Sequence, residues 1–234
     1  MAPSADPATD AGGAAGSPAV NVQQAAGTSA QAIQSAVDAY RLDLGDSRQE
    51  INWDGVPDDL AAPNLLPADF FNTVVPRGAV FSTRGTGFQV SANAGVAPVE
   101  FDNINPTYSR LFATFSPQRL FTPLGSNIME VRFFVPGTST PATTNGFGAV
   151  FTDVDRPGTR IEYLDERGHR LARFDVPASP GQETLSFLGV RFLDRRVARV
   201  RITSGNTVLG PNERRDRDLV VMDDFIFGTP IALG

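Results

Sequence analysis

From residue 50 to residue 228 the chain is a succession of short β-branched and aromatic stretches separated by glycine, proline, asparagine and aspartate. This pattern constrains the fold most, because strands of an all-β domain are short and end at turn residues, whereas helices need longer periodic runs. The clearest runs span 128–135, 146–152, 159–164, 169–175, 184–193, 196–203 and 219–227, and weaker runs lie at 51–56, 79–83, 86–92, 98–102 and 119–122. About ten to twelve short strands predict an all-β sandwich of two antiparallel sheets, with a jelly roll as the favoured wiring.

Two of these runs show how their side chains are oriented. In 196–203, Val200 and Ile202 share one side while Arg199 and Arg201 share the other, which predicts a half-buried strand with arginines outside. The connection between 159–164 and 169–175 contains Gly168, which can adopt a positive φ, and it predicts a hairpin with a bulge.

The N-terminal part of the chain differs from the rest. Residues 1–28 contain almost no large apolar side chain, a composition that predicts a flexible, low-complexity tail. In 29–45, Ile33, Val37, Tyr40 and Leu44 recur at helical spacing, so we expect one amphipathic helix. We expect the helix to dock on the β-sandwich domain, residues 50–230, although docking on another subunit stays open.

Composition excludes several kinds of site. The 234 residues include no cysteine and one histidine, which excludes disulfides, thiolate nucleophiles and multi-histidine zinc sites. All 20 positive charges are arginines, against 26 acidic residues, and this excess of acid argues against a nucleic-acid partner. Between Arg156 and Asp218, however, 13 arginines stand against 9 acids, so this half of the chain can present a mildly basic face.

The sequence says little about location. No apolar run of 18 residues predicts a membrane span. The first residues have neither the basic nor the apolar region of a signal peptide, so an export signal would have to come from elsewhere.

The most informative position is a pair of aspartates within the last predicted strand. Strict alternation puts Asp223 with Val221, Phe225 and Phe227 on one face and Asp224 on the other. One carboxylate then points among large apolar neighbours, where it needs an arginine, backbone donors or a metal.

Oxygen ligands without histidine or cysteine favour a hard cation, and we expect calcium as the cofactor. The first and last strands of a jelly roll can be neighbours, so Asp54 could join Asp223 and Asp224 as a ligand. Asp153 and Asp155 project to one side at the end of another strand and form a second candidate set. The alternative is that these aspartates pair with arginine or cap turns.

The second half of the chain resembles a known group of domains. The segments concerned are GFGAVFTDVD (146–155), IEYLD (161–165) with Gly168, SFLGVRF (186–192), VARVRI (197–202) and MDDFIFG (222–228). Together they resemble uncharacterised bacterial secreted β-sandwich domains that accompany PEP-CTERM-type sorting signals, and more loosely carbohydrate-binding and MAM-type modules. The resemblance implies an extracellular or cell-surface, calcium-stabilised binding module, although the sequence has no sorting tail after Gly228.

Sugar binding needs an exposed aromatic ring and a few polar groups. Trp53 is the best candidate for the ring, with core packing as the alternative, and Asn103, Asn105 and Tyr108 could add contacts from a loop. His169, in the predicted hairpin, is more typical of a solvated turn residue than of a general base.

Three functions are compatible with these sequence features. The first is a secreted calcium-dependent module that binds polysaccharide or another surface component. The second is a structural subunit of a filament, coat or matrix that self-associates through its N-terminal tail and helix. The third is a glycoside hydrolase; the absence of G-x-S-x-G, H-E-x-x-H and phosphate-binding glycine motifs leads us to expect no enzyme.

Overall fold

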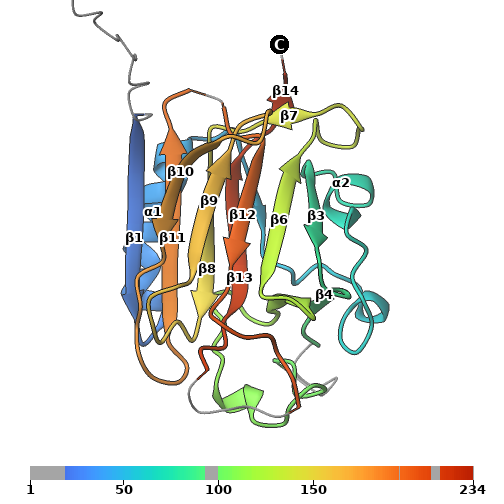
Figure 1. The fold of residues 1–234 in the computed structure, drawn as a ribbon, viewed down its shortest axis with the longest axis vertical. Helices are drawn as coiled ribbons and strands as arrows, with labels where there is room; N and C mark the ends of the chain where they lie inside the picture. Colours follow the sequence, from blue (N-terminus) through green and yellow to red (C-terminus); the bar gives the residue numbers. More distant parts are fainter. Residues whose placement is uncertain (1–18, 93–99, 195, 212–216, 234) are drawn as a thin grey trace, which may run out of the picture.

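Two antiparallel sheets pack face to face in the computed structural model, which describes residues 19–92, 100–194, 196–211 and 217–233 (Figure 1). The seven-stranded sheet has the order β1-β11-β8-β13-β5-β4, with β2 also paired to β13, and the five-stranded sheet has the order β10-β9-β12-β6-β3. The first sheet contains β1 (Val20–Gly27), β2 (Arg48–Ile51), β4 (Gly87–Val90), β5 (Phe121–Leu124), β8 (Gly146–Thr152), β11 (Leu185–Phe192) and β13 (Val221–Gly228). The second contains β3 (Ala79–Thr83), β6 (Ile128–Phe133), β9 (Arg160–Leu164), β10 (Arg170–Asp175) and β12 (Arg199–Thr203). The prediction of an all-β sandwich is confirmed.

Short elements complete the architecture. The strands β7 (Ala142–Thr143) and β14 (Ile231–Ala232) pair at one end of the sandwich, and the helices are α1 (Ala30–Leu44), α2 (Phe70–Thr73), η1 (Asp58–Leu60) and η2 (Tyr108–Arg110). Within the described residues, no helix is both long and apolar enough to cross a membrane.

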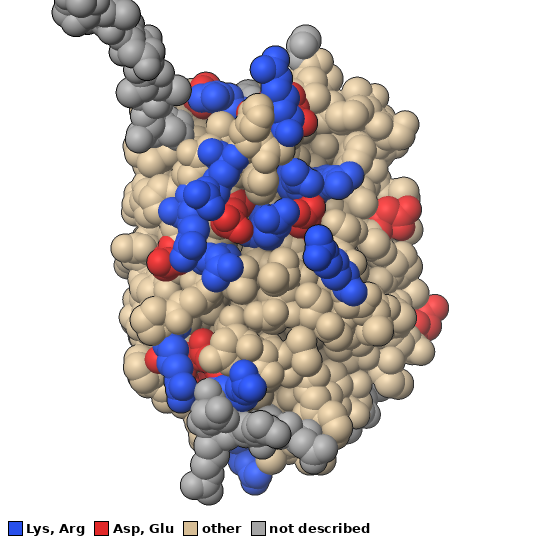
Figure 2. Space-filling model, in the orientation of Figure 1, with Lys and Arg blue, Asp and Glu red and all other residues tan. Residues whose placement is uncertain are grey.

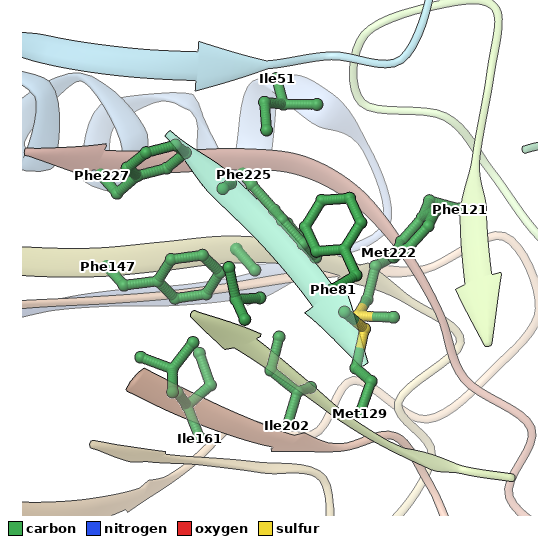
Figure 3. Packing of buried hydrophobic residues seen from close by; sticks show 14 of the residues in the cluster. Ile51, Phe81, Phe121, Met129, Phe147, Ile161, Ile202, Met222, Phe225 and Phe227 are labelled. Carbon is green, nitrogen blue, oxygen red and sulfur yellow. The ribbon is translucent and has the colours of Figure 1, made fainter. Parts of the chain in front are cut away.

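The core lies between the two sheets and is rich in phenylalanine (Figure 3). Phe147, Phe225 and Phe227 enter it from the seven-stranded sheet, and Ile161 and Ile202 from the five-stranded sheet. The period-two pattern explains this placement, because alternate residues of a strand face opposite sides.

The helix α1 covers the outer side of the seven-stranded sheet, as predicted. Its buried side chains are Ile33, Val37, Tyr40 and Leu44, the four that set its helical spacing. The Tyr40 ring lies over glycines of β8 and β11, and a Cβ at Gly189 would come within 2.6 Å of it. The tyrosine hydroxyl donates a hydrogen bond to the carbonyl of Val190. Small residues in the sheet therefore provide the site on which the helix docks.

The prediction of a flexible tail over residues 1–28 is wrong for residues 20–27. These residues form β1, which pairs with β11 over its whole length. No side chain of β1 is fully buried, so hydrophobicity gave no signal for this strand. Backbone pairing to β11 and contact with α1 order it instead. Residues 1–18 lie outside the described part of the chain.

The predicted orientation of β12 and of its neighbouring hairpin is confirmed. Val200 and Ile202 are buried, whereas Arg199 and Arg201 lie on the outer side of the sheet. Gly168 adopts a φ of 81° in the turn between β9 and β10, and the register of these strands shifts beside it.

Candidate functional site

The two aspartates of β13 lie at a bulge. Met222 pairs with Phe151 and Phe225 pairs with Ala149, so two residues of β13 stand against one residue of β8. The extra residue at a bulge breaks the alternation of side chains, so Phe225 faces the same side of the sheet as Met222 although the two are three residues apart. Met222 and Phe225 therefore both belong to the main core, and the strict alternation expected from the sequence is wrong at this point.

Both carboxylates are buried and are bound by a segment far away in the sequence. Asp223 is 0% exposed and Asp224 4% exposed. Asp223 Oδ2 accepts hydrogen bonds from the backbone N–H groups of Phe115 (2.6 Å) and Ser116 (3.3 Å). The Ser116 hydroxyl lies 3.2 Å from Asp223 Oδ1 and 2.5 Å from Asp224 Oδ1, and the Arg41 guanidinium lies 3.8 Å from Asp224. The pair thus fastens residues 115–116 to β13.

Burial changes the protonation of this pair. Burial and the charge of Asp224 raise the pKa of Asp223 well above its usual range, against the opposing hydrogen bonds from Phe115 and Ser116. Burial also raises the pKa of Asp224, although Ser116, Asp223 and Arg41 act in the opposite direction. Two neighbouring carboxylates do not readily ionise together, so the pair keeps a proton to higher pH than an isolated aspartate would.

Asp54 binds the same segment. Its Oδ1 accepts hydrogen bonds from the backbone N–H groups of Gln118 (2.7 Å) and Arg119 (3.2 Å). Because β2 pairs with β13, the chain just after β2 returns beside the acid pair, and Trp53 Nε1 donates to the carbonyl of Asp223. The expected meeting of the first and last strands is confirmed, and Asp54, Asp223 and Asp224 all contact residues 115–119.

In the arrangement described above, the oxygen atoms of Asp54, Asp223 and Asp224 are not placed to bind a calcium ion. Calcium is held by about six to eight oxygen atoms. Here Asp223 Oδ2 and Asp54 Oδ1 each accept two backbone N–H groups, whose positive ends point at the position a cation would need. Over the described ranges, no group of three or more His, Cys, Asp or Glu side chains is arranged to hold a metal. Calcium binding stays a prediction from the sequence.

The second predicted set of acids, Asp153 and Asp155, makes hydrogen bonds with other segments of the chain. The backbone of Asp153 adopts a φ of 66° and its N–H donates to the carbonyl of Thr184. Asp155 accepts a hydrogen bond from the N–H of Gly181, and its own N–H donates to Asp218. These contacts fix the loop that follows β8.

The predicted sugar-binding residues need correction. Trp53 is 1% exposed and its ring stacks on Phe121 with centroids 4.0 Å apart, so it belongs to the core. Tyr108 is also buried, and its hydroxyl exchanges hydrogen bonds with Gly210. Neither ring can serve as an exposed platform.

The two asparagines hold loops. Asn105 is buried and accepts hydrogen bonds from the N–H and hydroxyl of Thr107. Asn103 has an exposed side chain that donates to Gln89. The four residues therefore do not form a ligand surface.

The most prominent charged surface lies on the other sheet. Figure 2 shows arginines gathered over the outer side of the five-stranded sheet, with a few acidic side chains between them. We call this surface the arginine face; its members are Arg132, Arg160, Arg170, Arg173, Arg199 and Arg201, together with Glu130, Glu162 and Asp175. Six arginines against three acids give the face a surplus of three positive charges, although the whole chain carries −6.

Cross-strand register arranges these charges in rows. In one row Arg173, Glu162, Arg201 and Glu130 lie opposite one another in turn, so that positive and negative side chains alternate across four strands. In the next row Arg199 of β12 lies directly opposite Arg132 of β6. The first row is balanced, and the surplus charge is therefore concentrated in the second.

Glu130 holds two of these arginines. Its carboxylate lies 2.7 Å from Arg201 and 3.2 Å from Arg199. Partial burial alone would raise the pKa of Glu130, but the Arg201 hydrogen bond and the charges of Arg199, Arg201 and Arg132 lower it below its usual value. Glu130 is therefore ionised at neutral pH and fixes the guanidinium groups beside it.

Two hollows open along the arginine face. The first hollow, of about 440 Å³, is lined by Ser82, Thr83, Arg84, Ile128, Glu130 and Arg201. The second hollow, of about 420 Å³, is lined by Arg132, Phe134, Pro141, Arg167, Arg199 and Leu233, among others. Glu130 lines the first hollow and Arg132 the second, and the two residues are two positions apart on β6, so the hollows follow one another along this strand.

Comparisons with known proteins give little. No family model and no curated protein matches the chain. One solved structure, the enzymatically active domain of tailspike protein 4 from bacteriophage CBA120, matches 70% of this chain and 20% of its own length, at 12% identity and a TM-score of 0.26. The chain thus spans about a fifth of that structure, and a likeness of this size assigns no activity.

The prediction that this chain is not an enzyme is withdrawn. The solved structure that it matches is an enzymatically active domain, and a TM-score of 0.26 supports neither the presence nor the absence of an activity in this chain. The motifs absent from the sequence are those of particular enzyme families, and their absence excludes only those families.

Proposed function

We propose that this protein is a cell-surface or secreted β-sandwich module that binds an acidic polysaccharide along the arginine face. The observation that carries the proposal is a surplus of three positive charges on one open sheet face of a chain whose net charge is −6. Charge complementarity selects and orients a partner even where each exposed ion pair contributes little. Only the resemblance of the strand motifs to secreted domains supports the location.

The shape of the face supports a chain-like ligand. The two hollows follow one another along β6, and the seam between β6 and β12 connects them with Arg199, Arg201 and Glu130. A polymer that lies along this seam reaches both hollows at once, and several weak contacts on one chain add up.

The distribution of charge favours a polysaccharide over a nucleic acid. Glu130 and Glu162 interrupt the arginines, whereas a nucleic acid gains its affinity by neutralising many phosphates on a continuous basic surface. A polysaccharide can combine a few carboxylate contacts with packing of its sugar rings in the hollows, so it suits this face better.

The test compares two double variants with equal loss of charge. We expect Arg170→Gln with Arg173→Gln, on the arginine face, to weaken binding of polygalacturonate at least threefold and to lower its salt dependence. Arg77→Gln with Arg110→Gln removes two exposed arginines elsewhere and should leave binding within twofold. Absence of binding in the unmodified protein, or equal weakening in both variants, would overturn the proposal.

A second candidate function is self-assembly, and one observation favours it. Among the described strands, β1 stands at the end of the seven-stranded sheet and pairs with β11 alone, so one side of its backbone is available to a further strand. Val22 on this strand is 36% exposed. If copies associate through β1, Val22→Lys should reduce the mass measured by light scattering, and an unchanged monomer in both proteins would exclude this function.

A further inference from the structure

We infer that the second hollow is the subsite in which one carboxylate-bearing sugar unit of the polysaccharide is bound, with Arg132 as the residue that binds its carboxylate. This inference rests on the proposed function and adds the chemical class of the unit and the residue that selects it. Three features of the hollow support it: its charge balance, the position of its arginines and its apolar surface.

The charge balance leaves Arg132 as the available cation. Arg199 stands opposite Arg132 in the sheet, and like charges in facing positions destabilise a strand pair. Glu130 forms ion pairs with Arg199 and Arg201, at 3.2 and 2.7 Å, and interacts with Arg132 only at longer range, so one carboxylate faces three arginines. Arg132 is exposed and has no acidic group within 4 Å among the ion pairs of the described residues. A bound carboxylate would supply the missing negative charge.

The acids that line the hollow are already engaged. Asp165 accepts hydrogen bonds from the backbone N–H groups of Arg167 (2.9 Å) and His169 (2.7 Å), so it holds the β9–β10 turn. Glu166 lies 3.8 Å from Arg167. Neither carboxylate therefore neutralises Arg132.

Gly168 and Glu130 position the second arginine. A Cβ at Gly168 would come within 2.9 Å of Arg199 Nη2, so the guanidinium lies against a residue that has no side chain. Nη1 of Arg199 is held by Glu130, and the Cβ atoms of Arg199 and Arg132 have the spacing of facing strand residues, about 5 Å. Two arginines at facing positions can direct their guanidinium groups to one carboxylate, and the planar fork of each suits two parallel hydrogen bonds.

The apolar part of the hollow suits a sugar ring. Phe134 is half-buried, Pro141 is exposed and Leu233 is 42% exposed, and all three line the hollow. The C–H face of a sugar packs on such a surface while its polar groups reach the rim. An apolar surface beside paired arginines matches a uronic acid, in which the carboxylate is attached directly to the ring.

The experiment measures binding of trigalacturonate and polygalacturonate by calorimetry in the full chain. We expect Arg132→Gln to weaken trigalacturonate binding at least tenfold, because it removes a charge-assisted hydrogen-bond donor. Arg173→Gln is the matched comparison: it removes one exposed arginine of the same face outside the hollow, so we expect it to weaken binding less than Arg132→Gln does. Arg110→Gln is the control away from the face and should leave binding within twofold. Arg132→Lys keeps the charge without the fork and should give an intermediate loss.

The outcomes separate this inference from the proposed function. The methyl ester of polygalacturonate has the same backbone without the charge, and we expect it to bind at least tenfold more weakly than the acid. If polygalacturonate binds but Arg132→Gln and Arg173→Gln weaken it equally, or if trigalacturonate does not bind, the inference fails while the function stands. If dextran sulfate or duplex DNA binds more tightly than polygalacturonate, the assignment to a carboxylate fails. If no acidic polymer binds, both fail.

Discussion

The two outer faces of the sandwich carry charged residues in opposite situations. On the seven-stranded sheet, Asp223 and Asp224 are buried and contact residues 115–116 and Arg41. On the five-stranded sheet, the arginines are partly or fully exposed, and Arg132 has no ion pair within the described ranges. The comparison shows that burial decides whether a charged side chain stabilises the fold or is available to bind a partner.

This difference separates stability from recognition. A buried carboxylate that accepts several hydrogen bonds is costly to remove, because its donors are left without partners. An exposed ion pair contributes about 0–1 kcal/mol, so its removal leaves the fold nearly unchanged. We call the outer side of the seven-stranded sheet, on which α1 packs, the covered face, and the arginine face the open face. Substitutions on the covered face should therefore change the free energy of unfolding, and those on the open face should change binding.

The largest expected effect is that of Asp223→Ala. The backbone N–H groups of Phe115 and Ser116 lose their acceptor, and we expect the free energy of unfolding to fall by about 3 kcal/mol in urea titrations. Asp175→Ala, the same change on the open face, should cost about 0.5 kcal/mol or less, since its ion pair with Arg173 is exposed. Equal losses in the two variants would remove the distinction between the faces.

The next effect tests the cover formed by α1. Gly189→Ala places a Cβ within 2.6 Å of the Tyr40 ring, and we expect a loss of about 1–3 kcal/mol from overpacking. Gly55→Ala is the control, because a Cβ there meets nothing within 4 Å. In the double variant with Tyr40→Ala, the two losses should be less than additive, since the ring that the new methyl group would contact is absent. Full additivity would mean that the glycines do not form the docking site.

The sequence predicted the strands better than it predicted the irregular positions. The short apolar runs gave both sheets and the helical spacing gave α1, because burial and periodicity are local signals. The strand β1 was missed because its order depends on pairing with β11, which its composition does not show.

The site was predicted only in part. The meeting of Asp54, Asp223 and Asp224 followed from the neighbouring first and last strands, but the bulge at Asp223–Asp224 depends on register against β8. Trp53 was named as a candidate ring for sugar binding, with core packing as the alternative, because the sequence does not show that it packs against Phe121. The arginine face had two signals, the excess of arginine in residues 156–218 and the alternation in 196–203, yet Arg132 lies on another strand and joins them only through cross-strand register.

Dependence on pH should have opposite signs on the two faces. The pKa of Asp223 is raised in the folded state, so its contribution to stability is present at low pH and is lost as pH rises through the folded pKa. The pKa of Glu130 is lowered, so its contribution is present above the unfolded pKa and is lost as pH falls through the folded one. Urea titrations between pH 3 and 9 should show that stability falls less steeply with rising pH in Asp223→Asn than in the unmodified protein.

The same titrations test the open face. In Glu130→Gln the acid limb should be flatter, with a change of about 0.5 kcal/mol because the ion pairs are partly exposed. If Glu130→Gln instead reduced the loss of stability with rising pH, or Asp223→Asn flattened the acid limb, the charges of the two faces would be coupled.

The smallest expected effect is that of calcium on stability. Its measurement tests whether a calcium ion can replace the N–H groups that Asp223 and Asp54 of the covered face now accept. A cation beside Asp223 and Asp54 must displace the four backbone N–H groups that their oxygens now accept, so the gain from the ion is offset by the donors it leaves behind. We expect millimolar calcium to raise the unfolding midpoint by no more than about 2 °C over EDTA, and Asp223→Asn to abolish the rise. A rise of many degrees that is lost in this variant would mean that residues 115–119 rearrange around a bound ion, and the covered face would then be a ligand site as well as a structural one.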